Sequence, residues 1–136
     1  MNKDNKKYSE HFKNIVGKGA EKFDSITCLF AIHYFFESEV KLEGFLNNVA
    51  TNLKKDGIFI CTFMDGDSVE AVLGADGIVE GRKMLDNTNV LVWAIIKRFT
   101  TSDDYYNRRI DVFIENTQRL IPEYLVNFNF LLKKAS

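Results

Sequence analysis

Two apolar runs joined by an amphipathic helix constrain the fold of this chain more than any other feature. The first run, 24–31, consists almost entirely of apolar or β-favouring residues, as is typical of a parallel strand that is covered on both faces. The second run, 58–63, follows Gly57 directly. A strand, a helix and a strand joined by short connections are typical of a parallel sheet. The sequence therefore predicts an α/β fold.

The helix between the two runs has signals at both ends. Ser38 is a favoured N-cap residue, and Glu39 in the first turn interacts favourably with the helix dipole. Lys54 and Lys55 are expected in the last turn, and Gly57 is expected to end the helix. Its apolar stripe consists of Leu42, Phe45, Leu46, Val49 and Leu53.

The rest of the chain is predicted to add antiparallel strands and further helices. Strands are expected at 90–99 and 109–115, with a polar hairpin loop at 100–107 between them. The Gly- and Asp-rich stretch 74–89 is expected to be irregular. Pro122 fits the first position of a final helix. Helical spacing of apolar residues supports this final helix (Leu125, Phe128 and Leu132) and an N-terminal one (Tyr8, Phe12, Ile15 and Val16).

We expect these elements to form one domain over 1–136. Its helices should cover both faces of a central sheet that is parallel first and antiparallel later. The chain is 46% hydrophobic over 136 residues, which is enough for one compact core but not for two. A net charge of −1 excludes a strongly basic surface, so any contact with nucleic acid must be local.

Cysteine content and hydropathy indicate an intracellular protein. Cys28 and Cys61 lie in apolar runs without CxxC spacing, which predicts free thiols in a reducing compartment and no zinc or disulfide framework. The N-terminus lacks the apolar segment of a signal peptide. No apolar run approaches the roughly 18 residues that cross a bilayer, so no membrane partner is expected.

Two short motifs invite a ligand-binding interpretation, and local structure accounts better for both. Asp65 and Asp67 flank Gly66 after a strand, but their number and spacing do not fit a calcium loop. A turn with Asx hydrogen bonds, followed by a short helix, is the prediction there. The Gly17–Lys18–Gly19 segment lacks the preceding strand that a phosphate loop needs, so a linker is predicted.

Three segments together resemble one enzyme family. They are FDSITCLFAIHYFFESE at 23–39, NNVATNLKKDGIFICTFMDGD at 47–67 and IENTQRLIPEYLVNF at 114–128. Their sequence, order and spacing are similar to segments of the eukaryotic and viral mRNA cap guanine-N7 methyltransferases. The HYxFES block is fairly specific to this family, whereas the KKDGIFI junction is common to many methyltransferases. The resemblance covers roughly 23–128.

The resemblance implies a partial Rossmann-like class I methyltransferase fold and a specific reaction. The family transfers a methyl group from S-adenosylmethionine to N7 of the guanine at the capped 5′ end of RNA. Because N7 is itself the nucleophile, no residue need act as an acid or base, and catalysis rests on positioning and electrostatics. The implied place of action is the nucleus for a cellular protein and the host cytoplasm for a viral one.

The resemblance also assigns roles to individual residues. Glu123 would accept hydrogen bonds from guanine N1 and the exocyclic amine. His33 would donate to the base and Phe30 would lie against its face. Tyr34 would line the joint pocket of cofactor and cap. Leu29 stands where the family usually has a Gln that touches the cofactor.

Apart from the resemblance, ordinary structural roles would also suit these residues. Glu123 fits the first turn of a helix, where free backbone N–H groups stabilise an acid. His33 fits the end of a strand, bonded to backbone groups. Phe30 and Tyr34 fit the core, which is the usual place for aromatic side chains.

The sequence also departs from the family in ways that favour a second hypothesis. It shows no glycine-rich loop after a first strand and no acid after a second strand to hold a cofactor ribose. Met64 stands where the family often has Pro near the cap. Further methyltransferase segments or a capping-enzyme subunit are therefore expected as partners, and the isolated chain is expected to be inactive and to self-associate. The alternative function is a non-catalytic methyltransferase-like module that binds capped RNA or a partner protein.

Overall fold

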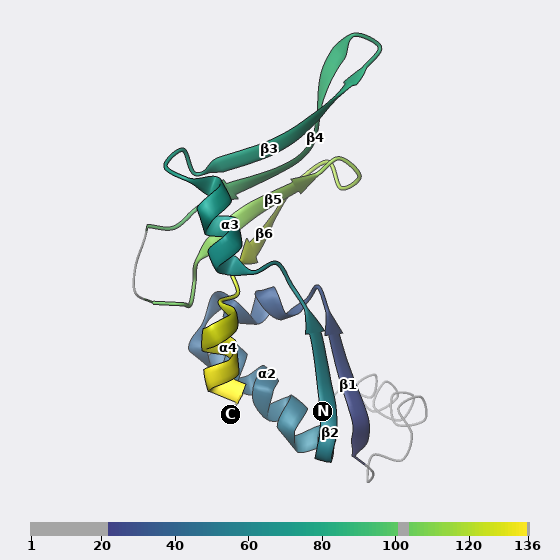
Figure 1. Cartoon of the computed structure of the whole chain (residues 1–136), viewed down its shortest axis with the longest axis vertical. Helices are drawn as coiled ribbons and strands as arrows, with labels where there is room; N and C mark the ends of the chain where they lie inside the picture. The colour runs from purple at the N-terminus through teal and green to yellow at the C-terminus, as the bar shows by residue number, and fades with distance from the viewer. Residues whose placement is uncertain (1–21, 101–103, 136) are drawn as a thin grey trace, which may run out of the picture.

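The computed structural model describes residues 22–100 and 104–135 and confirms an α/β fold (Figure 1). A parallel sheet contains β1 (Phe23–Leu29) and β2 (Leu53–Thr62). An antiparallel sheet in the order β3-β4-β5-β6 contains Ile78–Leu85, Thr88–Lys97, Arg109–Ile114 and Leu120–Tyr124. The helical elements are η1 (Ile32–Glu37), α2 (Glu39–Asn52), α3 (Gly66–Leu73) and α4 (Phe128–Ala135). The parallel and antiparallel strands thus lie in two sheets in the described part, not in one central sheet.

Two sequence predictions lie outside the described residues. One is the N-terminal helix around Tyr8, Phe12, Ile15 and Val16. The other is the linker at Gly17–Lys18–Gly19.

The first strand–helix–strand unit has the predicted parallel pairing. Cys28 of β1 lies opposite Cys61 of β2 in the ladder. Ser38 caps α2, because its hydroxyl oxygen accepts a hydrogen bond from the Lys41 N–H at 3.4 Å. Leu42 is fully buried on the helix face that was predicted to be apolar. The capping residue and the apolar stripe therefore place α2 as the sequence indicated.

The end of α2 differs from the prediction. The helix ends at Asn52, and Leu53 has an extended backbone that pairs with Phe23. Lys54 is not in a last helical turn; its Nζ lies 2.8 Å from the Asp24 carboxylate across the sheet. Lys55 likewise belongs to β2. Pairing with β1 therefore outweighs the helix-ending signals of the lysines and Gly57.

A buried core joins the parallel sheet to η1, α2 and α4. It contains Ile32, Phe36, Leu42, Val126 and Leu131. Half-buried side chains pack against it, among them Cys28, Phe59 and Cys61 from the inner face of the sheet and Phe63 just after β2. Figure 1 shows α2 and α4 beside this sheet and α3 beside the antiparallel one. A second buried cluster, Leu73, Ile110, Val112 and Leu125, lies under α3.

The final helix also differs in detail from its predicted apolar stripe. Leu131 is the side chain of α4 that is buried, whereas Phe128 and Leu132 are about half exposed. Leu125 is buried but precedes the helix and packs in the cluster under α3. The helix begins at Phe128, and the Asn127 side-chain oxygen accepts a hydrogen bond from the Phe130 N–H at 2.8 Å. This is the bond that an N-cap residue makes.

The stretch 74–89 was predicted to be irregular, and this prediction is wrong, because half of it forms β3 and its last two residues begin β4. Asp86 and Asn87 both have positive φ, 47° and 63°, and join Leu85 to its partner Thr88. A two-residue turn with positive φ at both positions matches the twist of a hairpin, and Asp and Asn tolerate it. The polar turn residues therefore mark a tight hairpin between β3 and β4.

Pro122 was predicted at a helix start, and this prediction is wrong. It lies in β6, opposite Asp111 of β5. Because β6 is the last strand of its sheet in the described part of the chain, one side of it makes no ladder hydrogen bonds there and can accept a proline. Glu123 consequently lies on a strand and not in the first turn of a helix.

The two sheets are joined where the chain leaves β2 and where it leaves β6. The Gly66 N–H donates to the Val126 carbonyl at 2.7 Å. The Asn127 side-chain amide donates to both carboxylate oxygens of Asp67 at 2.9 Å. The Asp65 carboxylate accepts from the Ser68 N–H and hydroxyl, so Asp65 makes the predicted local side-chain hydrogen bonds as the N-cap residue of α3. Among the described residues no group of three His, Cys, Asp or Glu side chains could hold a metal ion.

We predict that Gly66→Ala destabilises the protein. A Cβ at this buried position would lie 2.8 Å from the Val126 carbonyl oxygen, so the junction would have to open. The expected loss is about 1–3 kcal/mol in the free energy of unfolding, measured by urea denaturation. Gly44→Ala is the matched control, because a Cβ there meets nothing within 4 Å in the middle of α2. That substitution should stabilise by about 0.5–1 kcal/mol, and a Gly66→Ala protein as stable as wild type would contradict the prediction.

We predict that the outer face of the parallel sheet makes the isolated chain self-associate. Leu29, Ile58 and Ile60 lie on that face with exposed fractions of 60%, 61% and 48%. Parallel sheets normally have both faces covered, and such apolar surfaces promote association. Ile58→Lys with Ile60→Lys should reduce association in sedimentation velocity runs at several concentrations. Val40→Lys, which removes an exposed apolar residue from α2, should have no such effect. A monomeric wild type at every concentration would refute the prediction.

Candidate functional site

The candidate site lies where β1 ends, at the carboxyl end of a parallel strand. Ligands of α/β proteins commonly bind outside this end of a sheet. Leu29 is the last residue of β1, and Phe30 follows it with a side chain that is 68% exposed. The Phe30 backbone has a φ of 49°, in the left-handed region. The chain therefore leaves the sheet at Phe30 and enters η1.

Helix η1 fixes the next two candidate residues in different environments. Ile32 and Phe36 are fully buried in the core and anchor the helix. His33 is buried and Tyr34 is 45% exposed. Their ring centroids are 4.1 Å apart with the planes tilted by 56°. A 3₁₀ helix of six residues is longer than most.

Glu123 reaches the same place from β6, which packs against η1. The Glu123 Oε2 lies 3.7 Å from the His33 Nε2, which is too far for a hydrogen bond. The side chains of His33 and Glu123 are only 11% and 14% exposed. Among the residues that the structure describes, the buried His33 Nε2 has no hydrogen-bond partner. A buried nitrogen beside a buried carboxylate, without a bond between them, is an arrangement that a polar ligand would complete.

Burial shifts the pKa values of both groups. It lowers the pKa of His33 below 6.5 and raises the pKa of Glu123 above 4.5. An ion pair at 3.7 Å would favour the charged form of each group, but no hydrogen bond joins them and burial dominates. The imidazole is therefore biased to its neutral form at neutral pH. When Glu123 is ionised, its poorly solvated carboxylate attracts N–H donors strongly.

The structure thus brings together three of the five predicted site residues by direct contact, namely His33, Tyr34 and Glu123. Phe30 and Leu29 lie at the strand end from which η1 continues, both with exposed side chains. The expectation that Phe30 or Tyr34 packs in the core is wrong. Sequence reasoning missed Thr62, whose backbone and side chain both contact Phe30. A Thr inside an apolar strand run carries no signal for this role.

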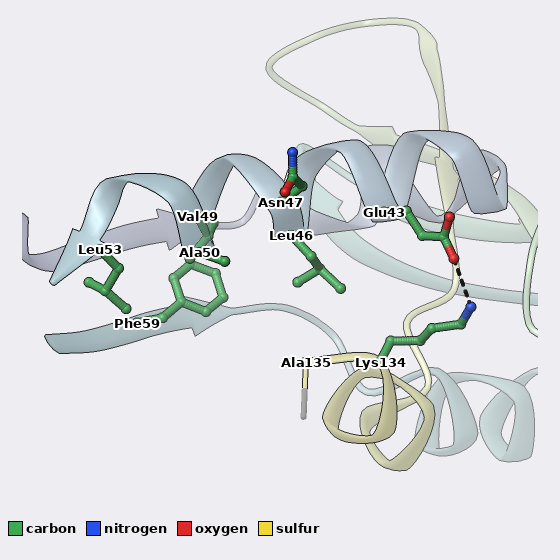
Figure 2. A pocket seen from close by; sticks show the side chains of 9 residues that line it. All are labelled: Glu43, Leu46, Asn47, Val49, Ala50, Leu53, Phe59, Lys134 and Ala135. Atoms are coloured by element: carbon green, nitrogen blue, oxygen red, sulfur yellow. Dashed lines mark hydrogen bonds and ion pairs between the residues drawn. The ribbon is translucent and has the colours of Figure 1, made fainter. Parts of the chain in front are cut away.

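A separate cavity of about 440 Å³ lies between α2, β2 and α4 (Figure 2). Its walls are mostly apolar and include Leu46, Leu53 and Phe59. The Lys134 Nζ lies 3.1 Å from the Glu43 carboxylate at its rim, as the dashed line in Figure 2 shows. None of the candidate residues lines this cavity, which is therefore separate from the candidate site.

No helix within the described ranges is long and apolar enough to cross a membrane.

The sequence model of the mRNA (guanine-N(7))-methyltransferase domain matches residues 5–136. The chain belongs to this family. It is 49% identical over 112 residues to an mRNA cap guanine-N(7) methyltransferase of Aspergillus niger, covering 79% of this chain and 17% of that protein. It is 29% identical over 126 residues to a probable mRNA-capping enzyme of Acanthamoeba polyphaga mimivirus, covering 89% of this chain and 10% of that protein. The chain therefore spans only a small part of the length of these relatives.

A solved structure confirms the fold. The chain resembles an S-adenosylmethionine-dependent methyltransferase from Clostridium acetobutylicum with a TM-score of 0.51 and 16% sequence identity. The match covers 99% of this chain and 59% of that one. At this identity the likeness shows the fold alone. The predicted partial methyltransferase fold is thus confirmed, and the family assignment rests on the sequence comparisons.

We predict a pH-dependent gain in stability for Glu123→Gln. Because burial raises the pKa of Glu123 in the folded state, the neutral carboxyl favours folding, fully so below about pH 4.5. This contribution is lost as the pH rises through the higher folded pKa. The amide of Gln does not ionise, so the variant should gain in stability relative to wild type between pH 4.5 and 8 in urea denaturation. The control is Glu80→Gln at the surface, where a hydrogen bond from Arg82 lowers the pKa of the Glu80 carboxyl. That variant should lose stability relative to wild type as the pH rises. A pH-independent difference for Glu123→Gln would refute this.

Proposed function

We propose that this chain is the part of an mRNA cap guanine-N7 methyltransferase that holds the cap guanine. The buried and unbonded pair of His33 and Glu123 at the carboxyl end of β1 is the observation that carries the proposal. Leaving such groups without partners costs free energy, and a ligand with matching donors and acceptors would recover it. Membership of the guanine-N7 methyltransferase family supports guanine as that ligand.

The chemistry of guanine complements the His33 and Glu123 pair and the neighbouring Phe30 ring. Its N1–H and exocyclic amine are donors on one edge of the base, and the Glu123 carboxylate would accept both. Its other edge carries the O6 and N7 acceptors, and the His33 ring nitrogen would donate to the base. The exposed Phe30 ring offers a face for stacking, which contributes about 1–3 kcal/mol per base. These contacts together would fix the orientation of N7.

The proposed reaction needs orientation and a suitable electric field, and no proton transfer. The N7 lone pair forms the new bond to carbon, and guanine gains a positive charge. A Glu123 carboxylate at the opposite edge of the base would stabilise that charge. His33 is buried and its lowered pKa keeps it neutral, so it adds no opposing positive charge beside the base. No side chain of the chain is assigned as a general acid or base.

Leu29 and Tyr34 would form one wall of the cofactor site. Both are exposed at the carboxyl end of β1, and they offer an apolar and an aromatic surface that fit a nucleoside-bearing cofactor. S-adenosylmethionine, when bound, supplies a methyl group on a positively charged sulfur. The other contacts to it are expected from further methyltransferase segments or a capping-enzyme subunit. The enzyme would act on capped RNA in the nucleus, or in the host cytoplasm if it is viral.

We predict that Glu123→Ala weakens the binding of an unmethylated cap analogue by about 10–100-fold, because a hydrogen bond to a charged group is lost. Isothermal titration with GpppA measures this. Replacing the guanosine of GpppA by inosine removes the exocyclic amine, so the inosine analogue should bind wild type more weakly than GpppA does. The Glu123→Ala variant should no longer distinguish the two analogues. Glu115→Ala, at a carboxylate that pairs with Lys83 just after β5, is the matched control and should bind like wild type. Equal affinities of wild type and Glu123→Ala for both analogues would contradict the proposal.

A further inference from the structure

We propose that Thr62 is a positioning residue that holds Phe30 in its left-handed backbone conformation and so presents the Phe30 ring at the candidate site. The positioning itself rests on the geometry of β1 and β2. The consequence for guanine binding rests on the proposed function.

The backbone of Phe30 is unusual for its residue type. A φ of 49° brings Cβ close to the backbone and is unfavourable for every residue except glycine, and most tolerated by Asn and Asp. Of the described residues other than glycine with positive φ, Phe30 is the only apolar one; the others are Asp56, Asp86, Asn87, Asn107 and Gln118. Burial of the ring does not compensate, because the side chain is 68% exposed. Strained residues of this kind are maintained by their surroundings and gather at binding sites.

Thr62 is the neighbour that maintains the conformation. The Phe30 N–H donates to the Thr62 carbonyl oxygen at 3.0 Å and to the Thr62 hydroxyl at 3.2 Å. The carbonyl bond extends the pairing of Leu29 with Thr62 by one residue and is open to any amino acid at position 62. The hydroxyl bond needs Thr or Ser. The β-branched Thr side chain is also stiff at χ1, so its oxygen is held in place.

The conformation of Phe30 decides where the rest of the site lies. A residue with extended backbone at this position would continue β1. The left-handed turn instead directs the chain out of the sheet after Phe30, so that η1 begins at Ile32 and carries His33 to within 3.7 Å of Glu123. Thr62 therefore acts on the site through Phe30, without a place in the guanine contacts proposed above.

The test compares Thr62→Val, which keeps the shape and loses the hydroxyl, with Thr62→Ser, which keeps the hydroxyl. The first readout is independent of any ligand: the three-bond HN–Hα coupling and the amide hydrogen exchange of Phe30 by NMR. Thr62→Val should change the coupling and accelerate exchange, whereas Thr62→Ser should resemble wild type. The second readout is GpppA affinity, which should fall about two- to tenfold in Thr62→Val and recover in Thr62→Ser.

The outcomes separate the positioning role from the proposed function. An unchanged Phe30 backbone in Thr62→Val overturns the positioning role. A changed backbone with unchanged GpppA affinity supports positioning but refutes the place of the Phe30 ring in the guanine site. If Thr62→Val is poorly stable, a third variant, Phe30→Gly, provides the test. Glycine adopts the left-handed conformation without strain, so Phe30→Gly should stabilise the chain. In a double-mutant cycle, Thr62→Val should then cost less stability in the Phe30→Gly background than in wild type. Additive effects of the two substitutions would overturn the proposal.

Discussion

The close approach of Gly66 to Val126 is the contact on which the geometry of the candidate site depends. The Gly66 N–H meets the Val126 carbonyl at 2.7 Å, and this fixes the end of the antiparallel sheet against the end of the parallel one. Glu123 lies on β6, three residues before Val126. Val126 packs with Ile32 and Phe36, the buried residues of η1 that flank His33. The distance of 3.7 Å between the two site residues therefore depends on this backbone contact, which neither of them makes, together with the turn at Phe30.

The fold could be predicted where the deciding signals are local. The strand within 24–31, the Ser38 cap and most of the stripe on α2 each depend on a few neighbouring residues, and the structure contains all three. The expected cover on both faces of that strand is wrong for the described residues, because β1 is largely exposed on its outer face. Errors arose where a non-local partner decided the outcome. Pro122 has the signal of a helix start, but an edge strand accepts it because β5 pairs with only one side of β6. The hairpin turn at 86–87 was missed because its polar residues also suit an irregular loop.

The candidate site was less predictable from the residues than the fold. His33 and Glu123 lie far apart in the chain and meet only because two sheets are joined, so no spacing rule connects them. The family resemblance named both residues, and the structure then placed them together. Neither the residue pattern nor the family resemblance could identify Thr62, because a phenylalanine at position 30 gives no sign that its φ is positive. Positions of this kind are determined by the surrounding backbone.

The site combines several features that cost stability, and the core around it accounts for their persistence. A buried imidazole without a partner, a desolvated carboxyl and a left-handed phenylalanine are each unfavourable in the folded chain. They lie beside Ile32 and Phe36, which are fully buried and leave η1 little freedom to relax. A reaction that depends on the orientation of the base, and not on proton transfer, would benefit from such rigidity, because positioned groups need not reorganise when charge develops on the guanine. The unfavourable local features are then those expected of a binding site that is preorganised for its ligand.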